Sequence, residues 1–390
     1  MVLDASSMTG NWNYPTTVWF GNGRIKETPS ACIRLNMKKP LLVTGPDLLA
    51  LDMLKALNAD LTARGLKPAI FTGFKPNPTG ANVGDGVSAY RDSQCDGVIA
   101  LGGGSALDVG KAIALMVGQT RSLWDFEDIG DNWTRVNEAG VRPIIAIPTT
   151  AGTGSEVGRA SVIHDEVAIL KKIIFHPKML PKIVIADPKL SIGLSEKLTA
   201  ATGMDALSHN LEAFCAPGYH PMADGISLEA MRLIKNNLHD AVQDGNNLVA
   251  RSNMLCASLM GATAFQKGLG GMHALAHPLG ATYNAHHGLL NAILMPYVLK
   301  YNADVLEVPI ARLCQWLSIS DQSVNGFIMW VLELREQIGI PHSLSEIGID
   351  DSKLVEISEK AENDPASAGN PKIMTKDDYQ KILLAAIAGK

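Results

Sequence analysis

The sequence predicts two domains, an α/β domain built on a parallel sheet and, after it, an all-α domain. The chain has 390 residues, which exceeds the usual size of one domain and favours two. Short apolar runs alternate with helical patterns through the first half, and such runs disappear in the second half. We therefore expect one domain at 1–190 and another at 191–390.

The apolar runs of the first half are the expected strands. Each run is short and is interrupted or closed by Gly, Pro or Asp, as is typical of buried parallel strands joined by crossover helices. The runs are PLLVTG (40–45), KPAIFTG (67–73), GVIALGGGS (97–105), RPIIAIPTT (142–150) and KIVIAD (182–187). In the second half, ISLEAMRLIKNNLHDAV (226–242) has the spacing of an amphipathic helix. Thr375 is the expected N-cap of a final helix.

The composition argues against several classes of partner. Hydrophobic residues make up 46% of the chain and charged residues 19%, with a net charge of -5, so there is no surplus of positive charge to bind nucleic acid. Neither a basic and apolar leader nor a run of about eighteen apolar residues is evident. The five cysteines are dispersed and include no CxxC pair, which disfavours a disulfide framework. We expect a cytoplasmic protein without membrane or nucleic-acid partners.

A glycine-rich turn joins an expected strand to an expected helix in VIALGGGSALDVGKAIAL. Gly102, Gly103 and Gly104 allow the backbone to approach a ligand closely, and the N–H groups at the start of the helix can bind an anion. Ser105 and Asp108 have the spacing of a capping box. The stretch matches neither G-x-G-x-x-G nor a Walker loop, so a plain turn is the alternative to a pyrophosphate site.

A second loop, IPTTAGTGSE (147–156), also follows an apolar strand and is rich in Thr, Ser and Gly. Such groups line nucleotide clefts, and they also cap helices. The loop by itself therefore leaves a cofactor site and a structural turn both open.

Four residues form two pairs with helical spacing. Asp205 and His209 lie four positions apart on an expected helix and project from the same face, although one such pair is more often a surface contact. His273 and His277 repeat the spacing in an apolar, glycine-rich segment, where a surface position is harder to sustain. Pro278 disfavours helix at His277 and should end or kink the segment there.

A further histidine completes a set of metal ligands. His287 follows His273 by fourteen residues and precedes another apolar run. Asp205, His209, His273 and His287 together offer one carboxylate and three imidazoles. This set suits a divalent first-row metal, Fe(II) or Zn(II).

The chain resembles the iron-containing (group III) alcohol dehydrogenases, which have the dehydroquinate synthase-like fold. The similarity runs in order through nearly the whole chain, and the combination of motifs is specific. The motifs are FGNGR, KPNPT, GGGSALDVGKA, PTTAGTGSEV, DALSH, HALAHPLGATYNAHHG and AGNP. The resemblance implies an N-terminal Rossmann-like α/β domain and an all-α C-terminal domain, with cofactor and metal between them.

The resemblance also implies roles for individual residues. It places iron ligands at Asp205, His209, His273 and His287, and a further histidine near the nicotinamide at His277. The expected cofactor-binding residues are Gly45, Gly102, Gly103, Gly104, Ser105, Asp108, Thr149, Thr150 and Lys172. Similar proteins are commonly dimers, so we expect a homodimer.

The choice of cofactor depends on the end of the first strand of the nucleotide domain. NAD-preferring members of the family often carry VTD there, and the carboxylate bonds the ribose 2′-hydroxyl. This chain has VTG, with Gly45 in place of the acid. The change removes a bond to NAD and also a repulsion against the 2′-phosphate of NADP, so either cofactor is expected. Asp47 could restore some NAD preference.

These features predict a metal-dependent NAD(P) alcohol dehydrogenase, or an aldehyde reductase in the reverse direction. The metal would polarise the substrate oxygen while hydride passes to or from the nicotinamide. His277, outside the four ligands, is the expected proton relay, with substrate orientation alone as its alternative role. Two alternatives from other classes are an NAD- and zinc-dependent lyase of the dehydroquinate synthase type and a noncatalytic nucleotide-binding protein.

Two cations suggest an acidic substrate. Arg159 follows the second glycine loop, and Lys267 precedes His273 by six residues in FQKGLGGMH. This stretch resembles the branch of the family that acts on ω-hydroxy acids such as 4-hydroxybutyrate. Arg159 and Lys267 could hold the far carboxylate of a short semialdehyde. The alternative is that both are solvated or pair with acidic neighbours.

Overall fold

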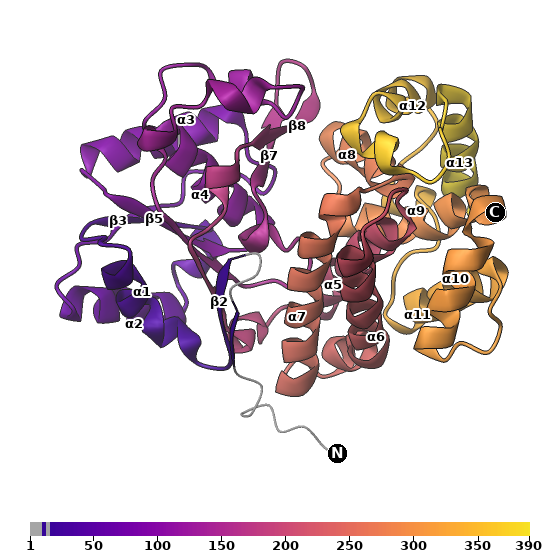
Figure 1. Cartoon of the computed structure of the whole chain (residues 1–390), viewed down its shortest axis with the longest axis horizontal. Coiled ribbons are helices and arrows are strands. Elements are labelled where there is room, and N and C mark those ends of the chain that lie inside the picture. The colour runs from indigo at the N-terminus through magenta and orange to yellow at the C-terminus, as the bar shows by residue number, and fades with distance from the viewer. Residues whose placement is uncertain (1–9, 13–15) are drawn as a thin grey trace. The chain divides into compact units, whose positions relative to one another are not determined.

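The computed structural model describes residues 10–12 and 16–390 and divides the chain into two compact units. Unit 1 comprises the described residues up to Thr150 together with Gly154–Ile192. Unit 2 comprises Ala151–Thr153 and Gly193–Lys390. Unit 1 contains a largely parallel sheet with helices, whereas unit 2 is helical (Figure 1). The predicted fold class is confirmed.

Unit 1 is built on a sheet whose strand order, over the described residues, is β1-β2-β9-β6-β5-β3-β4. All of its pairings are parallel except that of β1 with β2. The five predicted strands are β3 (Pro40–Thr44), β4 (Ala69–Phe71), β5 (Gly97–Gly102), β6 (Ile144–Pro148) and β9 (Ile183–Ala186). The sequence analysis missed β1 (Gly10–Trp12), β2 (Thr17–Phe20) and an antiparallel hairpin of β7 (Ala160–Asp165) and β8 (Leu170–Phe175).

Helices cover both faces of this sheet, which explains why its strands are apolar throughout. The helices are α1 (Thr28–Arg34) and α2 (Asp52–Ala63) on one face and α3 (Gly80–Asp92) and α4 (Gly104–Met116) on the other (Figure 1). Successive residues of a strand point to opposite faces. Val98 accordingly packs in a cluster with Val83 and Val109, whereas its neighbour Ile99 packs in another cluster with Leu54.

The turn between β5 and α4 needs its first glycine. Gly102 has a φ of +145°, and a Cβ there would lie 2.8 Å from the Cβ of Ala106. Gly103 is the N-cap of α4 and makes no side-chain capping bond. The carbonyl of Gly102 accepts a hydrogen bond of 3.0 Å from the N–H of Thr149. This bond joins the two glycine loops that the sequence analysis identified.

The predicted capping box at this turn is wrong. Helix α4 begins at Gly104, so Ser105 already lies inside the first turn and cannot act as the N-cap. Its hydroxyl donates to the carbonyl of Pro76 instead. The carboxylate of Asp108 accepts from the hydroxyl of Ser155 and, at 3.1 Å, from the N–H of Val162. Asp108 thus ties α4 to the second loop and to β7.

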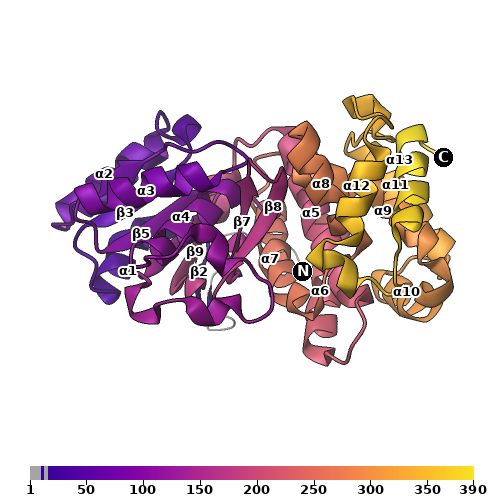
Figure 2. The same ribbon diagram turned by 90° about the horizontal axis from the view of Figure 1, so that it is seen from above.

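Unit 2 is formed by helices α5 to α13, which Figure 2 shows from above. They are α5 (Glu196–Cys215), α6 (Pro221–Gln243), α7 (Leu248–Ala264), α8 (Gly271–Tyr283), α9 (His287–Tyr301), α10 (Ala303–Leu317), α11 (Val324–Gln337), α12 (Leu354–Glu362) and α13 (Lys376–Ala388). The predicted helix at 226–242 is part of α6, and Thr375 caps α13 as expected. Over the described residues, no helix is both long enough and apolar enough to cross a membrane.

Two helices of unit 2 differ from the usual amphipathic pattern. Every residue of α5 from Thr199 to Phe214 is buried, so the polar side chains on this helix must find partners inside the protein. Helix α8 continues through Pro278 to Tyr283. The helix therefore does not end at His277, because the surrounding packing overrides the local preference against helix before proline. A kink there, the other expected outcome, stays a prediction.

Candidate metal centre

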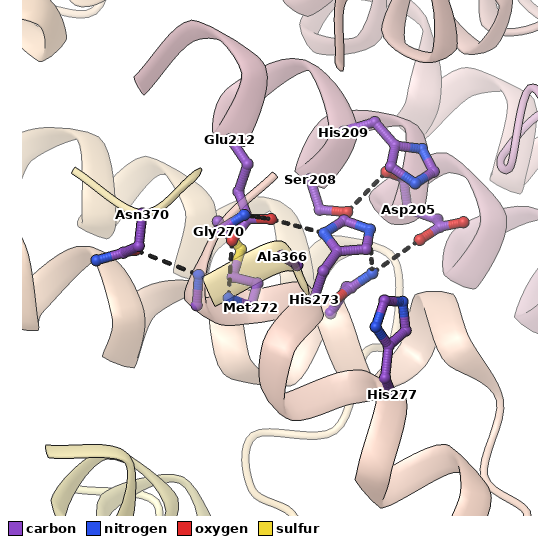
Figure 3. Close-up of polar contacts among 12 residues, drawn as sticks. Asp205, Ser208, His209, Glu212, Gly270, Met272, His273, His277, Ala366 and Asn370 are labelled. Atoms are coloured by element: carbon purple, nitrogen blue, oxygen red, sulfur yellow. Dashed lines mark hydrogen bonds and ion pairs between the residues drawn. The ribbon is translucent and has the colours of Figure 1, made fainter. Parts of the chain in front are cut away.

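Four side chains from three helices of unit 2 converge on one point. Asp205 and His209 come from α5, His273 comes from α8, and His287 is the first residue of α9. Each offers one ligand atom, and these atoms all lie within 4.8 Å of one another. Figure 3 shows how Asp205, His209 and His273 lie together. The structure thus brings together all four predicted ligands.

A glycine permits the close approach that places His287 in this group. A Cβ on Gly288 would lie 2.4 Å from the carbonyl oxygen of Ala201 and 2.8 Å from the Cβ of Asp205. Any larger residue would push the start of α9 away from α5. The dipeptide His287-Gly288 therefore combines one of the four converging side chains with the small residue that lets it reach the other three.

Hydrogen bonds orient two of the imidazoles so that their Nε2 atoms are left for a metal. The Nδ1 atom of His209 lies 3.2 Å from the carbonyl oxygen of Gly152, and Nδ1 of His273 lies 2.6 Å from Oε2 of Glu212. Each oxygen acts as an acceptor, so Nδ1 carries the proton and Nε2 keeps its lone pair. Metal-binding histidines are typically fixed in this way. The residues present therefore fit a divalent metal.

Burial keeps the central imidazole neutral. Desolvation, followed by the neighbouring His209, holds the pKa of His273 well below its usual value. A neutral imidazole is the form that binds a metal. His273 also stacks on His209, with ring centroids 4.8 Å apart.

Asn291 is a polar neighbour of the ligands that the sequence analysis missed. Its Nδ2 atom lies 3.0 Å from Oδ1 of Asp205 and 3.1 and 3.3 Å from Nε2 of His273 and His287. It is fully buried, and among the described residues its Oδ1 atom has no hydrogen-bond partner. Asn291 follows His287 by four positions on α9, and this spacing was the available signal.

Glu212 is the second residue that was missed. It is buried on α5, three positions after His209, and accepts hydrogen bonds from the backbone N–H groups of Gly270 and Met272 as well as from His273. Burial raises its pKa to about 7, and the two backbone N–H groups oppose this effect. No local spacing in the sequence pointed to Glu212, because its partners lie 58 to 61 positions away.

His277 lies beside the four ligands and is held by an acid. Its Nδ1 atom is 2.9 Å from Oδ2 of Asp364, and both side chains are about nine-tenths buried. Its ring stacks on His287 at a centroid distance of 5.5 Å and an interplanar angle of 11°. In Figure 3 the ring points toward the group formed by Asp205, His209 and His273. His277 therefore lies beside the four converging side chains without being one of them, and its role in proton transfer stays a prediction.

Comparisons with known proteins agree with this geometry. Residues 15–188 match the family described as iron-containing alcohol dehydrogenase, and residues 199–387 match the C-terminal domain of the Fe-containing alcohol dehydrogenase family. The chain belongs to the iron-containing alcohol dehydrogenases. It is 37% identical over 380 residues to 4-hydroxybutyrate dehydrogenase from Cupriavidus necator. This alignment covers 95% of this chain and 98% of the relative.

Two solved structures are similar to this iron-containing alcohol dehydrogenase in fold as well as in sequence. A 1,3-propanediol oxidoreductase superposes with a TM-score of 0.90 at 36% identity, covering 95% of this chain and 97% of the other. Sulfoacetaldehyde reductase from Bifidobacterium kashiwanohense, in complex with NAD⁺, superposes with a TM-score of 0.87 at 27% identity, and both chains are fully covered. The chain is an oxidoreductase of the alcohol dehydrogenase type.

The predicted cofactor residues of this alcohol dehydrogenase lie in unit 1. Gly45 has an extended backbone, and a Cβ built there meets no atom within 4 Å. Lys172 lies on β8, where its Nζ atom is 3.1 Å from Asp165 and 3.5 Å from Glu127. Cofactor contacts of these residues, and of Thr149, remain predictions.

The two predicted substrate cations of this alcohol dehydrogenase have different surroundings. Lys267 donates to Oδ1 of Asp224 at 2.7 Å and to the carbonyl of Phe214 at 3.1 Å, and its side chain is 6% exposed. Arg159 is only partly buried and lies 5.6 Å from the ring centroid of Phe175. The ion pair favours a structural role for Lys267, and a substrate role for either cation stays a prediction.

Proposed function

We propose that this protein is an Fe(II)-dependent NAD(P) dehydrogenase of primary alcohols, or an aldehyde reductase in the reverse direction. The observation that supports this proposal is the convergence of Asp205, His209, His273 and His287, whose ligand atoms lie within 4.8 Å of one another. Zn(II) would also suit one carboxylate and three imidazoles. Family membership favours iron.

The protein contributes a fixed set of ligands and a proton acceptor. A divalent metal bound there would supply Lewis acidity at the substrate oxygen, and the nicotinamide would exchange the hydride. Asp205 supplies the negative charge of the ligand set. The acceptors at Nδ1 of His209 and His273 hold both rings in the orientation that directs Nε2 to the centre.

We assign the proton transfer to His277. Oxidation of an alcohol releases a proton as well as a hydride, so a basic group is needed close to the reacting oxygen. The bond between Nδ1 of His277 and Asp364 leaves Nε2 as the basic atom of the ring. The stacking of His277 on His287 supports a position beside the substrate.

The cofactor is assigned to unit 1. The glycine turn at Gly102 and the N-terminus of α4 provide backbone N–H groups for a pyrophosphate. The open space at Gly45 suits a cofactor with either a 2′-hydroxyl or a 2′-phosphate. A relative of known structure was determined with NAD⁺, so NAD is one of the two cofactors to be tested.

The substrate class that we favour is a short ω-hydroxy acid. Among the similar proteins, one is named for 4-hydroxybutyrate and one for sulfoacetaldehyde, whereas others are named for neutral alcohols such as 1,3-propanediol and methanol. The first two substrates have an anionic group opposite the reacting carbon. An arginine can hold a carboxylate through two parallel bonds, so we favour Arg159 as the group that recognises such a substrate.

The test is a substrate panel on protein freed of metal and then loaded without oxygen with Fe(II) or with Zn(II). 4-Hydroxybutyrate, 1,3-propanediol and 1-butanol should each be assayed with NAD and with NADP, and the aldehydes in reverse. Fe(II)-dependent appearance of NADH or NADPH is expected. Bound metal without net reduction of cofactor would support the lyase, and absence of both metal and turnover would support a binding protein. A homodimer and a cytoplasmic location also remain predictions.

A further inference from the structure

A buried carboxylate links two helices of the metal centre. Glu212 on α5 is 5% exposed and receives three hydrogen bonds, all from the start of α8. The donors are the N–H of Gly270 at 2.7 Å, the N–H of Met272 at 2.7 Å and Nδ1 of His273 at 2.6 Å. Figure 3 shows this arrangement on the side of His273 that faces away from Asp205.

We propose that Glu212 is the positioning residue of this centre. By accepting from Nδ1, it fixes the tautomer and the ring orientation of His273, so that Nε2 is presented to the metal. By accepting from Gly270 and Met272, it also fixes where the backbone that carries His273 begins its helix. The side chain of Glu212 thus determines both the orientation of the His273 ring and the position of the main chain that carries it.

Three features of the contact explain why a carboxylate occupies this position. Its two oxygen atoms offer enough lone pairs for three donors, whereas a glutamine would place an NH₂ group against one of them. The N-terminus of a helix favours negative charge. In addition, a Cβ on Gly270 would lie 3.0 Å from Oε1 of Glu212, so glycine allows the backbone to come this close.

A neighbouring contact separates the role of Glu212 at His273 from general support of α8. Oδ1 of Asn370 accepts from the N–H of Gly271 at 3.2 Å, and Asn370 has no hydrogen bond to His273 among those found in the described residues. Replacing Asn370 therefore weakens the start of α8 without freeing the imidazole. Replacing Glu212 does both, and the difference between the two variants reports on His273.

The experiment compares Glu212→Gln with Asn370→Ala and with Glu156→Gln, which changes a second buried carboxyl in unit 1. Metal affinity is measured by competition between each metal-free protein and a chelator for Co(II), together with the Co(II) absorption spectrum. Thermal unfolding without metal reports on the fold. We expect Glu212→Gln to weaken metal binding about 10- to 100-fold and to alter the spectrum, with little change in either control.

A second readout does not require metal. Nitrogen-15 chemical shifts of histidine in the metal-free protein distinguish the two tautomers. The population of the Nδ1–H form assigned to His273 should fall in Glu212→Gln, because the amide oxygen can take only one of the two carboxylate oxygen positions. If that variant does not fold, Gly270→Ala crowds the same carboxylate while keeping it; the new Cβ would also lie 3.2 Å from Oδ1 of Asn370, so this variant is compared with Asn370→Ala. Gly270→Ala should then weaken Co(II) binding, as expected for Glu212→Gln.

The inference is overturned if Glu212→Gln folds and binds Co(II) within twofold of the wild type, or if Asn370→Ala weakens binding equally. In the fallback case, unchanged Co(II) affinity in Gly270→Ala would overturn it. It rests on the proposal that the four side chains hold a metal. Failure of the wild type to bind Co(II) would defeat that proposal, whereas tight binding by both the wild type and Glu212→Gln would defeat only the role of Glu212.

Discussion

The Nδ1 atom of His277 lies 2.9 Å from Oδ2 of Asp364, and the other oxygen of this carboxylate accepts a hydrogen bond of 2.9 Å from the N–H of Ala366. The acid is therefore itself held in place. Such a pair fixes which nitrogen of the imidazole is available for proton exchange. Because Asp364 and His277 are far apart in the sequence, only the fold brings them together.

We predict that Asp364→Asn lowers kcat by roughly tenfold or more, within the range that general base catalysis contributes. Asparagine can still accept from Ala366 but also brings an NH₂ group that can face Nδ1 and stabilise the wrong tautomer. Metal content and unfolding temperature should remain close to wild type. A kcat that stays within twofold over the whole pH range would mean that Asp364 has no part in proton transfer.

The ligand assignment predicts a loss of metal from two variants. His273→Ala and His287→Ala each remove one of the four converging ligand atoms, so metal analysis should show near-complete loss of bound metal and of turnover. His286→Ala is the matched control, because this adjacent imidazole is exposed and bonds the N–H of Leu289. Full metal occupancy and activity in both ligand variants would contradict the assignment.

The sequence was sufficient to predict the four side chains that converge, but not the residues that support them. Helical spacing pointed to Asp205 with His209 and to His273 with His277. His287 was added because it precedes another apolar run and completes a four-ligand set. In contrast, Glu212 meets His273 across 61 positions and Asp364 meets His277 across 87. Contacts between helices at such separations depend on how the helices pack, and no local spacing records this.

The same reasoning explains which strands were found. β5 and β6 are buried along their whole length and form continuous apolar runs. β7 is buried only at alternate positions and contains Ser161 and His164, so its apolar signal is weak, and partner strand β8 includes two lysines. The helix that continues past Pro278 was missed because packing outweighs a local preference.

Gly45 predicts a change of cofactor preference. Its backbone is extended (φ −67°, ψ 146°), and a Cβ there meets no atom within 4 Å, so Gly45→Asp can be made without strain. The new carboxylate should bond a ribose 2′-hydroxyl and repel a 2′-phosphate. We expect the ratio of kcat/KM for NADH to kcat/KM for NADPH to rise. The rise should correspond to about 1–3 kcal/mol of transition-state free energy, the scale of one charged hydrogen bond. An unchanged ratio would contradict the assignment.

Glu156 predicts a dependence of stability on pH. Burial raises the pKa of this fully buried carboxyl from 4.5 to about 7, while its own backbone N–H and Lys111 oppose the effect. The folded protein therefore keeps a proton that the unfolded chain releases between pH 4.5 and 7. Consequently the free energy of unfolding should fall as the pH rises through this range, by up to about 3 kcal/mol.

Glu156→Gln should remove the part of this dependence that Glu156 contributes, because an amide does not titrate, whereas the part due to Glu212 remains. Urea unfolding of wild type and variant at pH 5, 6, 7 and 8 should show Glu156→Gln gaining stability relative to wild type as the pH rises. A constant difference between the two proteins over that range would mean that the pKa of Glu156 is not raised.

The last prediction concerns the far end of the substrate. Lys267 donates to Asp224 and to the carbonyl of Phe214 inside unit 2, and its side chain is 6% exposed. Its charge is therefore already compensated, and Lys267→Met would leave Asp224 without its cation, which destabilises the fold. Arg159→Met removes a guanidinium whose shape lets it hold a carboxylate through two parallel bonds.

We therefore expect Arg159→Met to lower the preference for succinic semialdehyde over butyraldehyde, measured as the ratio of kcat/KM, by about tenfold or more, the scale of one charged hydrogen bond. Lys267→Met should lower the unfolding temperature and leave this ratio nearly unchanged. If Lys267→Met alone abolishes the preference, the lysine recognises the acid in spite of its pairing with Asp224. A carboxylate held by either cation would lose that bond on substitution. The proposal that these cations recognise an anionic substrate is therefore wrong if neither substitution changes the ratio. It is also wrong if the wild type prefers butyraldehyde.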